Sequence, residues 1–482
     1  MKHQNRSQGF TRRWFIGGAA AFGAFGGCRF MEGTASSDRP LLRFGVVSDI
    51  HFVMEEGLLH YPDYGAETFV KTLEYFRDRG VDAVVCCGDM ADRSIGEELL
   101  AVGRAWERVF PDNRAPDCRS VEKLFVTGNH DFEGFKYGEN VRRVFPDPAV
   151  RAKHLIPNDF RGWWERAFHE EYRPTWLKEV NGYSFVGANY FEPRETPTGR
   201  MFNSALRDFY AANAKRLDPS RPFFHIQHPQ PKDTCFAPWC WGRDDGTSTD
   251  VLSRFPNAIA FSGHSHYPLT DPRFLWQGAF TSVNASSLRY MGHTDEEFPR
   301  DGRPVRAPDE PDARHGQLWS VHADRIDVER RDFRTGLPIG ETLTMPLPAA
   351  EPKPFAYAEH AKRLSAPEFL DGYAVTLEPD VGDSMRVLIP AVKPDSAARC
   401  YHYELRCSSG GKSVVRRVAN RNAMLSEKDP RAAEPTIISL SLKDLPGQPL
   451  AVTVTPVGYF GKRGKSLSAV FSMEKWQSPK GV

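Results

Sequence analysis

Five short blocks of the sequence carry Asp, Asn and His residues at spacings that suit metal chemistry. Each block follows a short apolar run typical of a buried strand, so each is expected where a strand ends. Carboxylate, amide oxygen and imidazole are hard or borderline ligands, and this mixture suits a pair of divalent metal ions held side by side. The blocks are Asp49-Ile50-His51, Gly88-Asp89-Met90-Ala91-Asp92, Gly128-Asn129-His130-Asp131, His228-Pro229 and Gly263-His264-Ser265-His266.

Asp89 is the residue that we expect at the centre of this chemistry. It follows the apolar run at residues 83–87, and Gly88 allows the chain to turn sharply just before it. A carboxylate has two oxygens, so a single Asp can contact both ions. We therefore assign the bridging position to Asp89.

Each block alone is a weak signal, because an Asp-x-His tripeptide arises by chance and a lone His is more often a packed residue than a ligand. The order and spacing of the blocks carry the prediction. His225 is a rival to His228, but Pro229 marks His228 as the residue where the strand stops. We expect His225 to lie in the core or just behind the ligands.

Alternating strand and helix patterns position the first three blocks. Strands are predicted at residues 41–47, 83–87 and 121–127, with helices at residues 66–79 and 97–110 between them. This order favours a largely parallel or mixed sheet covered by helices. Ligands of such sheets gather at the carboxyl ends of the strands, which is where these blocks are expected.

The middle of the chain continues the pattern after an insertion. Residues 132–174 show no clear core pattern beyond a helix near 163–172, and they are either a lid that selects the substrate or a surface excursion with a few packed aromatic side chains. The last three strands expected beyond it would run antiparallel and complete a second sheet. Strands are expected at 183–190, 223–227, 258–262, 280–284, 318–323 and 325–333, and helices at 205–217 and 250–255.

A Pro-rich linker at residues 346–354 is the best domain boundary in the chain. Helical patterns vanish beyond it, and seven alternating segments within residues 355–476 indicate an immunoglobulin-like sandwich. The last two segments resemble the final hairpin of fibronectin type III domains. The segments begin near Tyr373, Met385, Cys400, Ser413, Thr436, Leu450 and Ser466.

Taken together, the blocks resemble the motif set of the calcineurin-like metallophosphoesterase family, and residues 41–345 form the domain that carries the resemblance. It implies an α/β (α+β) fold, a four-layer β-sandwich flanked by helices, with the all-β immunoglobulin-like sandwich after it. Gly263 would allow the bend that lets two neighbouring His side chains reach adjacent ions. The implied ligands are Asp49, His51, Asp89 and His266 for one metal, and Asp89, Asn129, His228 and His264 for the other.

The resemblance also implies a reaction, the hydrolysis of a phosphoric ester. Two divalent metals lower the pKa of a bridging water, and the hydroxide then attacks phosphorus in line with the departing oxygen. His130 would donate the proton that the leaving group needs, and Asp92 would orient or charge-tune His130. Arg93 would either hold a phosphate oxygen bidentately or serve as a surface salt-bridge partner.

The ligand set does not select among manganese, iron, zinc or similar ions. Met90-Ala91 stands where purple acid phosphatases carry a Tyr, so a coloured ferric–tyrosinate centre is not expected. Asp131 after His130 matches the cyclic-nucleotide and general phosphodiesterase branches of the family. The substrate stays open between a phosphomonoester and a phosphodiester, and it would be a small molecule, a lipid or a nucleotide.

Two other functions stay open at this point. One keeps the metals but changes the bond, as in a hydrolase of a nucleotide pyrophosphate or a lipid-linked diphosphate. The other is a surface-binding protein whose site no longer turns over, with the C-terminal sandwich doing the binding. The intact ligand set favours an enzyme, since loss of a ligand is the usual mark of such decay. The formal charge of +1, from 63 basic and 62 acidic residues, gives no electrostatic signal for nucleic acid.

The first 28 residues are expected to be an export signal. A basic leader precedes a weakly apolar run at residues 14–27 that is too short to span a bilayer. Residues 11–16, Thr-Arg-Arg-Trp-Phe-Ile, resemble a twin-arginine signal, and residues 25–28 resemble a lipoprotein cleavage box. Cys28 is either lipidated or discarded with the signal, and residues 29–40 form a linker. We therefore expect an exported bacterial protein that is periplasmic or anchored to a membrane through Cys28.

Overall fold

The structure is a computed structural model, and it describes residues 39–53, 66–136, 139–190, 203–237, 244–291, 299–300, 303–304, 313–349 and 353–472. Residues 38–482 form one compact unit. The export signal, Cys28 and most of the linker at 29–40 lie outside the described residues. Within the described ranges, no helix is both long and apolar enough to cross a membrane.

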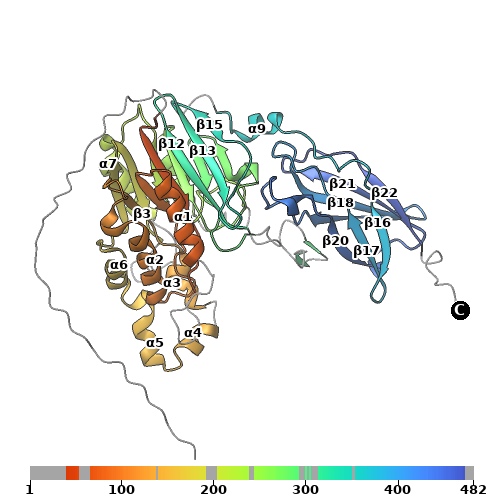
Figure 1. The fold of residues 1–482 in the computed structure, drawn as a ribbon, viewed down its shortest axis with the longest axis horizontal. Helices are drawn as coiled ribbons and strands as arrows, with labels where there is room; N and C mark the ends of the chain where they lie inside the picture. The colour runs from red at the N-terminus through yellow and green to blue at the C-terminus, as the bar shows by residue number, and fades with distance from the viewer. Residues whose placement is uncertain are drawn as a thin grey trace, which may run out of the picture. The chain divides into compact units, whose positions relative to one another are not determined.

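The first sheet has seven strands and is mixed (Figure 1). Strands β1, β2 and β3 run parallel to one another, and β12 pairs antiparallel with β1. The order is β14-β13-β12-β1-β2-β3, with β15 paired to β13. The bounds are β1 Leu42–Val47, β2 Ala83–Cys86, β3 Glu122–Phe125, β12 His315–Val321, β13 Arg325–Asp332, β14 Leu337–Pro338 and β15 Leu343–Pro346.

The second sheet has six strands in the order β4-β5-β6-β7-β9-β8. Its inner strands β5, β6, β7 and β9 are parallel, and β4 and β8 close the edges as antiparallel strands. The bounds are β4 Thr175–Val180, β5 Tyr183–Ala188, β6 Phe223–Ile226, β7 Ala258–Ser262, β8 Leu275–Gln277 and β9 Thr281–Asn284.

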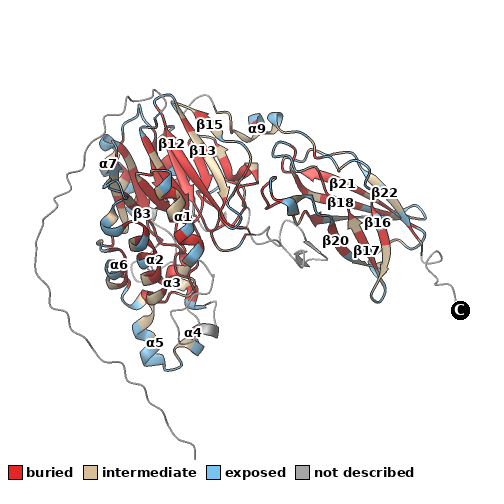
Figure 2. Cartoon of the chain, in the orientation of Figure 1, coloured by how far each residue is buried: buried red, intermediate tan, exposed pale blue. Residues whose placement is uncertain are grey.

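Helices cover the outer faces of both sheets, and the two sheets face each other. Strand alternation explains this packing, because successive side chains of a strand point to opposite faces. In β7, Ile259 and Phe261 join the apolar core between the sheets, whereas Ala258 and Ala260 join the core beneath the helices. Figure 2 shows the strands of this part of the chain largely in the red of buried residues. The helices are α1 Ala66–Asp78, α2 Gly96–Val109, α3 Asn129–Glu133, α4 Glu139–Val144, α5 Pro148–His154, α6 Phe160–Phe168, α7 Asn203–Asn213 and α8 Thr247–Leu252.

Aromatic rings fill the middle of the core between the sheets. Phe44 of β1 meets Phe185, Phe224 and Phe261 of the second sheet edge-on, with ring centroids 4.9 to 5.8 Å apart. Trp319 of β12 packs against the same cluster, 4.8 Å from Phe261. These contacts fix the two sheets against each other and confirm the four-layer α/β fold expected from the sequence.

Three predictions about the elements were wrong in part. Strand β9 was expected to be antiparallel, but it runs parallel to β7 inside the second sheet. Strands β12 and β13 join the first sheet beside β1, rather than a separate sheet, because the apolar alternation of a strand does not reveal its partner. The insertion helix expected at 163–172 is α6, which begins and ends earlier, at Phe160 and Phe168.

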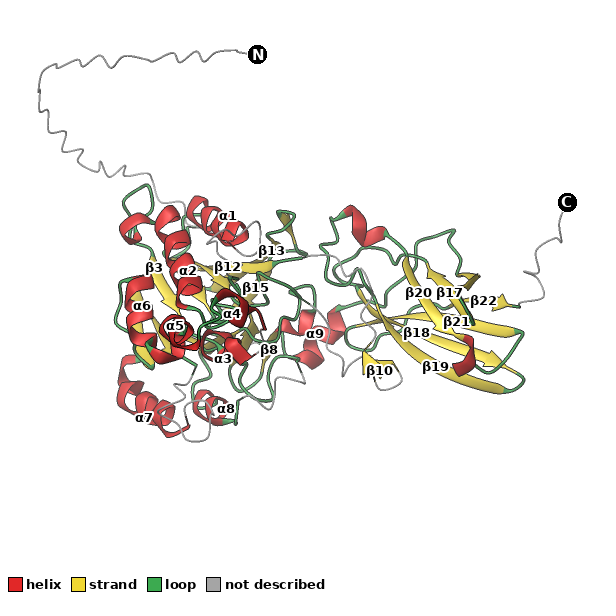
Figure 3. Ribbon diagram, turned by 90° about the horizontal axis from the view of Figure 1, so that it is seen from below, coloured by secondary structure: helices red, strands yellow, loops and turns green. Residues whose placement is uncertain are grey.

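The residues after β15, which we call the C-terminal β part (353–472), contain helix α9 and two antiparallel sheets (Figure 3). Helix α9, Tyr357–Arg363, was not expected from the sequence. One sheet has the order β16-β17-β20 and the other β19-β18-β21-β22. The strands begin close to the seven expected starts, whereas the fibronectin type III likeness and the boundary at 346–354 stay predictions. The bounds are β16 Thr376–Asp380, β17 Ser384–Ile389, β18 Cys400–Ser409, β19 Lys412–Ala419, β20 Thr436–Ser441, β21 Leu450–Gly458 and β22 Leu467–Phe471.

Candidate metal centre

The predicted ligands converge where parallel strands of both sheets end. Asp49 and His51 follow β1, and Asp89 follows β2. The acidic and His residues among the predicted ligands form two groups, and within each group the ligand atoms lie within 4.8 Å of one another. One group is Asp49, His51 and His266, and the other is Asp89, His228 and His264. The remaining positions are Asn129 at the start of α3 after β3, His228 after β6, and His264 and His266 after β7.

Five of these residues have a left-handed backbone, which non-glycine residues rarely adopt. A cluster of such strained positions persists only where surrounding structure holds it, and it is a frequent mark of functional sites. The strain turns each side chain off its strand and toward the other turns. The φ angles are 52° at Asp49, 47° at His51, 50° at Asp89, 66° at His264 and 53° at His266.

Glycines permit the close approach of the turns. A Cβ on Gly128 would overlap the Asp89 carboxylate, and a Cβ on Gly263 would overlap Ser48 and Asp49. Gly88 has φ of 102° and allows the turn before Asp89, as the sequence predicted. The expected role of Gly263 differs, because the bend is made by His264 itself and Gly263 is needed for its missing side chain.

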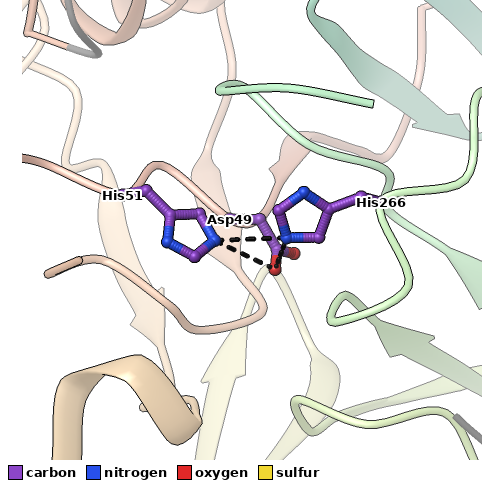
Figure 4. Close-up of side chains that lie close together, drawn as sticks. All are labelled: Asp49, His51 and His266. Atoms are coloured by element: carbon purple, nitrogen blue, oxygen red, sulfur yellow. Dashed lines mark hydrogen bonds and ion pairs between the residues drawn. The ribbon is translucent and has the colours of Figure 1, made fainter. Parts of the chain in front are cut away.

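The first group places three ligand atoms around one point (Figure 4). His266 Nε2 lies 2.9 Å from Asp49 Oδ1 and 3.2 Å from His51 Nε2. His51 Nε2 is 3.7 Å from Asp49 Oδ1 and also 3.7 Å from Asp89 Oδ2, so Asp89 reaches this group. The four residues assigned to one metal therefore lie together.

The second group contains the other oxygen and nitrogen ligands. His228 Nε2 lies 3.1 Å from Asp89 Oδ2 and 3.1 Å from the side-chain oxygen of Asn129. The rings of His228 and His264 are 5.0 Å apart between centroids. The backbone N–H of His264 donates to the Asp49 carboxylate at 3.0 Å, which ties the two groups together.

Hydrogen bonds on the far side of three imidazoles decide which nitrogen faces the centre. The Nδ1–H of His51 donates to Asp92 Oδ1 at 3.0 Å, that of His228 to the Cys87 carbonyl at 2.8 Å, and that of His266 to the Tyr290 carbonyl at 2.8 Å. An oxygen acceptor fixes the neutral ring with its proton on Nδ1 and its lone pair on Nε2. When these imidazoles are neutral, the centre is lined by acceptors that face acceptors, an arrangement that a metal cation or a proton stabilises.

The acid–base properties of the centre agree with a site built for positive charge. Burial opposes a charge on His228, but the Asp89 carboxylate outweighs it and raises the pKa of His228 to about 9. Burial also opposes the charged form of Asp89, yet His228 and His130 outweigh it and lower the pKa of that carboxyl. In the same way His266 outweighs burial at Asp49 and holds its pKa well below the ordinary value. Protons and metal ions thus compete for the same atoms.

His130 and Asp92 lie beside the first group, in an arrangement that differs from the expected one. The Asp92 carboxylate lies nearer to His51 than to His130: its Oδ1 is 3.0 Å from His51 Nδ1 and 3.8 Å from His130 Nδ1. The backbone carbonyl of Asp92 instead accepts from His130 Nδ1 at 2.8 Å. Asp92 thus orients a candidate ligand through its side chain and His130 through its backbone. Arg93 Nε lies 3.6 Å from Asp92 Oδ2, and its side chain is 13% exposed.

The sequence did not reveal the groups that position the ligands through a backbone carbonyl or that join the turns on which the ligands lie. The Cys87 and Tyr290 carbonyls carry no side-chain signal that a pattern could reveal. Asp131, read from the sequence as a subfamily mark, is buried and accepts from Gly128 N at 2.7 Å and Ala91 N at 2.8 Å, so it joins two of the turns. Burial and the charge of Asp89 raise the pKa of Asp131 to about 7.

His225, the rival to His228, lies in the core behind the site. It contacts the Tyr210 hydroxyl at 2.9 Å and Gln227 Oε1 at 2.8 Å, and it belongs to neither ligand group. Burial lowers the pKa of His225 to about 4, so the ring is neutral at pH 7.

Residues 42–268 match the family model of the calcineurin-like phosphoesterases. The matched range contains every strand end that supplies a candidate ligand. The chain therefore contains a calcineurin-like metallophosphoesterase domain, which supports a phosphoester hydrolase. A comparison with curated proteins gives no match.

Solved structures with a similar fold include several of this class. A dimetal phosphatase from Danio rerio is 13% identical, with 64% of this chain and 99% of that chain covered at a TM-score of 0.36. A purple acid phosphatase from yellow lupin is 12% identical, with 63% and 53% covered at a TM-score of 0.36. At these TM-scores the similarity to solved structures carries no argument about activity. The assignment of an activity to this chain depends on the family match and on the site.

Proposed function

We propose that the chain is a dinuclear metal-dependent phosphoesterase that hydrolyses phosphomonoesters or phosphodiesters. The observation that carries the proposal is the lining of the centre, where three Nε2 lone pairs, two carboxylates and an amide oxygen face one another. Such a set of acceptors repels itself when it is empty of positive charge, and carboxylate, amide and imidazole are the ligands that divalent ions take.

The donor set could be divided between two ions, with Asp89 available to both. Asp49, His51 and His266 would hold one ion and Asn129, His228 and His264 the other, with one Asp89 oxygen within 3.7 Å of His51 Nε2 and 3.1 Å of His228 Nε2. When bound, a metal pair supplies a water of lowered pKa and positive charge for phosphate oxygens. The ligands do not distinguish manganese, iron and zinc, so the identity of the ions is open.

His130 is proposed to protonate the leaving oxygen. Its backbone N–H donates to Asp89 Oδ1 at 2.7 Å, which fixes it next to the bridging carboxylate. Its ring lies 4.6 Å from the His51 ring between centroids, and its side chain is 21% exposed, so it borders both the centre and solvent. With Nδ1 bonded to the Asp92 carbonyl, Nε2 is the atom that would face the leaving group.

Arg93 is proposed to bind a phosphate oxygen from the same side. Its neighbour Asp92 pairs with it at 3.6 Å and would position the guanidinium, which can form two parallel hydrogen bonds to a phosphate.

The substrate would be a small-molecule, lipid or nucleotide phosphoester. Comparing bis-nitrophenyl phosphate with nitrophenyl phosphate in the presence of manganese separates diesterase from monoesterase. Failure to hydrolyse any phosphorus ester, with two ions bound, would contradict the proposal.

Export to the bacterial periplasm is a separate proposal that depends on residues 1–28 alone. The twin-arginine-like segment supports it, since that route carries folded proteins and would let the cytoplasm select the metal. The two fates of Cys28 give different masses. Mass spectrometry of the mature protein from the producing cell tests them, because an unmodified N-terminus beyond Cys28 excludes a lipid anchor.

A further inference from the structure

The backbone carbonyl that fixes His266 belongs to the loop at residues 285–291, which follows β9. His266 Nδ1 donates to the carbonyl of Tyr290 at 2.8 Å. The direction of the His266 ring therefore depends on where this loop holds one carbonyl. A shift of that carbonyl would turn Nε2 away from Asp49, its neighbour at 2.9 Å.

The 285–291 loop is held at its start by the turn that carries the other ligands. Ser287 Oγ donates to the Asp49 carbonyl at 3.1 Å, and Leu288 N donates to the Ser48 carbonyl at 3.1 Å. Arg289 Nη1 donates to the His51 carbonyl at 3.1 Å. These bonds place the first part of the loop, and Tyr290 N donates to Ser287 Oγ at 3.3 Å, so Tyr290 is tied to it. Met291, the next residue, reaches beyond these bonds.

The far end of the loop is held by the C-terminal β part. Met291, directly after Tyr290, packs in a buried apolar cluster with Ala313, Met424 and Leu425. Met424 is 1% exposed and Leu425 fully buried, so both are enclosed by this contact and its surroundings. Ser286 Oγ lies 3.0 Å from Met291 Sδ and adds a polar contact within the loop.

The same segment of the C-terminal β part also contacts the chain just after His266. Thr270 Oγ1 donates to the Ala423 carbonyl at 2.7 Å, and both atoms are buried. Residues 423–425 thus contact two side chains close to the His266–Tyr290 hydrogen bond. Thr270 is four residues after the donor, and Met291 is one residue after the acceptor.

We propose that residues 423–425 are a brace for the metal centre, and that Met424 and Leu425 position His266 through Met291 and the Tyr290 carbonyl. The inference deepens the proposed function, since it concerns a ligand of one of the two ions. It gives the C-terminal β part a role in the catalytic domain itself. The contacts given above lead to His266, a ligand of one ion, so the brace is expected to act on that ion.

Titration of the full-length, metal-free chain with Mn²⁺ by calorimetry tests the brace. Met424→Ala should weaken one of the two Mn²⁺ sites about 10-fold, the range found when groups behind a ligand are removed, and leave the other within twofold. Met424→Leu keeps the apolar contact and should restore both affinities. Unchanged binding in Met424→Ala, or equal weakening of both sites, overturns the proposal.

A double-mutant cycle with His266→Ala shows whether the effect passes through that ligand. In the His266→Ala background, Met424→Ala should cause no further loss of Mn²⁺ affinity. A loss as large as in the wild-type background would mean general destabilisation and would overturn the brace. The proposed function is judged separately, by whether the wild-type chain binds two Mn²⁺ ions before any substitution is made.

Two further variants keep the test independent of a folding defect. Thr270→Val removes the hydrogen bond to Ala423 with little change of volume, and it should weaken the same Mn²⁺ site by about fivefold or less. Tyr357→Phe is the matched control on the same boundary, because the Tyr357 hydroxyl donates to the Arg273 carbonyl at 2.6 Å and accepts from Phe236 N at 2.9 Å, away from the loop. It should leave both sites unchanged; weakening by Tyr357→Phe as large as by Thr270→Val overturns the proposal.

Discussion

The metallophosphoesterase domain and the C-terminal β part are both built from packed β-sheets, yet they treat the ends of their strands differently. In the domain, non-glycine residues take left-handed conformations at five ligand positions. In the described residues of the C-terminal β part, positive φ angles fall on glycines, such as Gly410 and Gly461. The ligand positions therefore carry backbone strain, as do some other turns of the domain, whereas the described C-terminal β part uses the residue that turns without strain.

The same contrast appears in what the two parts bury. Strand ends of the domain bury Asp49, Asp89 and His228, groups that oppose desolvation unless a cation or proton accompanies them. The core of the C-terminal β part between its sheets is apolar, with residues such as Val387, Leu405 and Val452 fully buried. The metallophosphoesterase domain therefore buries ionisable side chains that a cation would stabilise, whereas the C-terminal β part buries apolar side chains. The predictions below test this division, beginning with the largest effect.

Asp89→Asn should remove both ions and lower phosphoesterase activity by about 10³-fold or more, because Asp89 Oδ2 lies beside ligand atoms of both groups and the charge that stabilises the transition state goes with the metals. Elemental analysis of the purified variant gives the metal content, and a nitrophenyl phosphate assay gives the rate. Two retained ions per chain would contradict the bridging role of Asp89.

His130→Ala should keep both ions and slow hydrolysis by about 10² to 10⁴-fold for esters with poor leaving groups, the range expected for loss of a proton donor. Esters of nitrophenol, which leave without a proton, should be slowed much less. The measurement is kcat over a series of phosphoesters that differ only in the leaving group. An equal loss across the series would remove His130 from the proton-donor role.

Two Gly→Ala substitutions compare the parts directly. Gly128→Ala would press a methyl group into the Asp89 carboxylate, and we expect about a 10²-fold loss of activity with weakened metal binding, since small displacements of reacting groups have effects of that size. Gly410→Ala, at φ of 53° with open space around it, should lower the free energy of unfolding by about 1 to 2 kcal/mol and leave metal content unchanged. An equal loss of bound metal in the two variants would contradict the difference drawn between the two parts.

The last prediction concerns stability in acid and leaves activity aside. The folded pKa of His225 is about 4, below the ordinary value of 6.5, so the unfolded chain binds a proton first as the pH falls. The stabilisation is complete above pH 6.5 and is lost between pH 6.5 and 4, by about 3 kcal/mol for this residue. The free energy of unfolding of the metal-free chain, measured against pH, should fall less steeply in His225→Gln. Identical slopes would show that His225 is not the group that titrates.

Much of the fold and of the candidate site could be predicted because their signals are local. Each ligand block follows its own apolar run, so Asp49, Asp89 and His264 could be assigned to strand ends without knowing which strands pair. The pairing itself could not be predicted, since β12 reaches β1 across 268 or more residues and nothing in its alternation names that partner. Short edge strands such as β8 gave no periodic signal.

Roles carried by the backbone were also beyond the sequence. The carbonyl of Tyr290 fixes His266, and that of Asp92 fixes His130, but every residue has a carbonyl and its direction depends on the fold. Asp92 and His130 lie close together, as expected, but the atom of Asp92 that accepts from His130 is the backbone carbonyl oxygen and not a carboxylate oxygen. Motif reasoning identified which residues meet, whereas the hydrogen bonds that choose each tautomer required coordinates.

The central claim is that two cations lie between these strand ends and share Asp89. Crystals of the full-length protein grown with Mn²⁺ and measured by anomalous diffraction test it most directly. The account predicts two anomalous peaks per chain, one beside Asp49, His51 and His266 and one beside Asn129, His228 and His264, with Asp89 contacting both. A single peak, or two peaks that do not share Asp89, would contradict it.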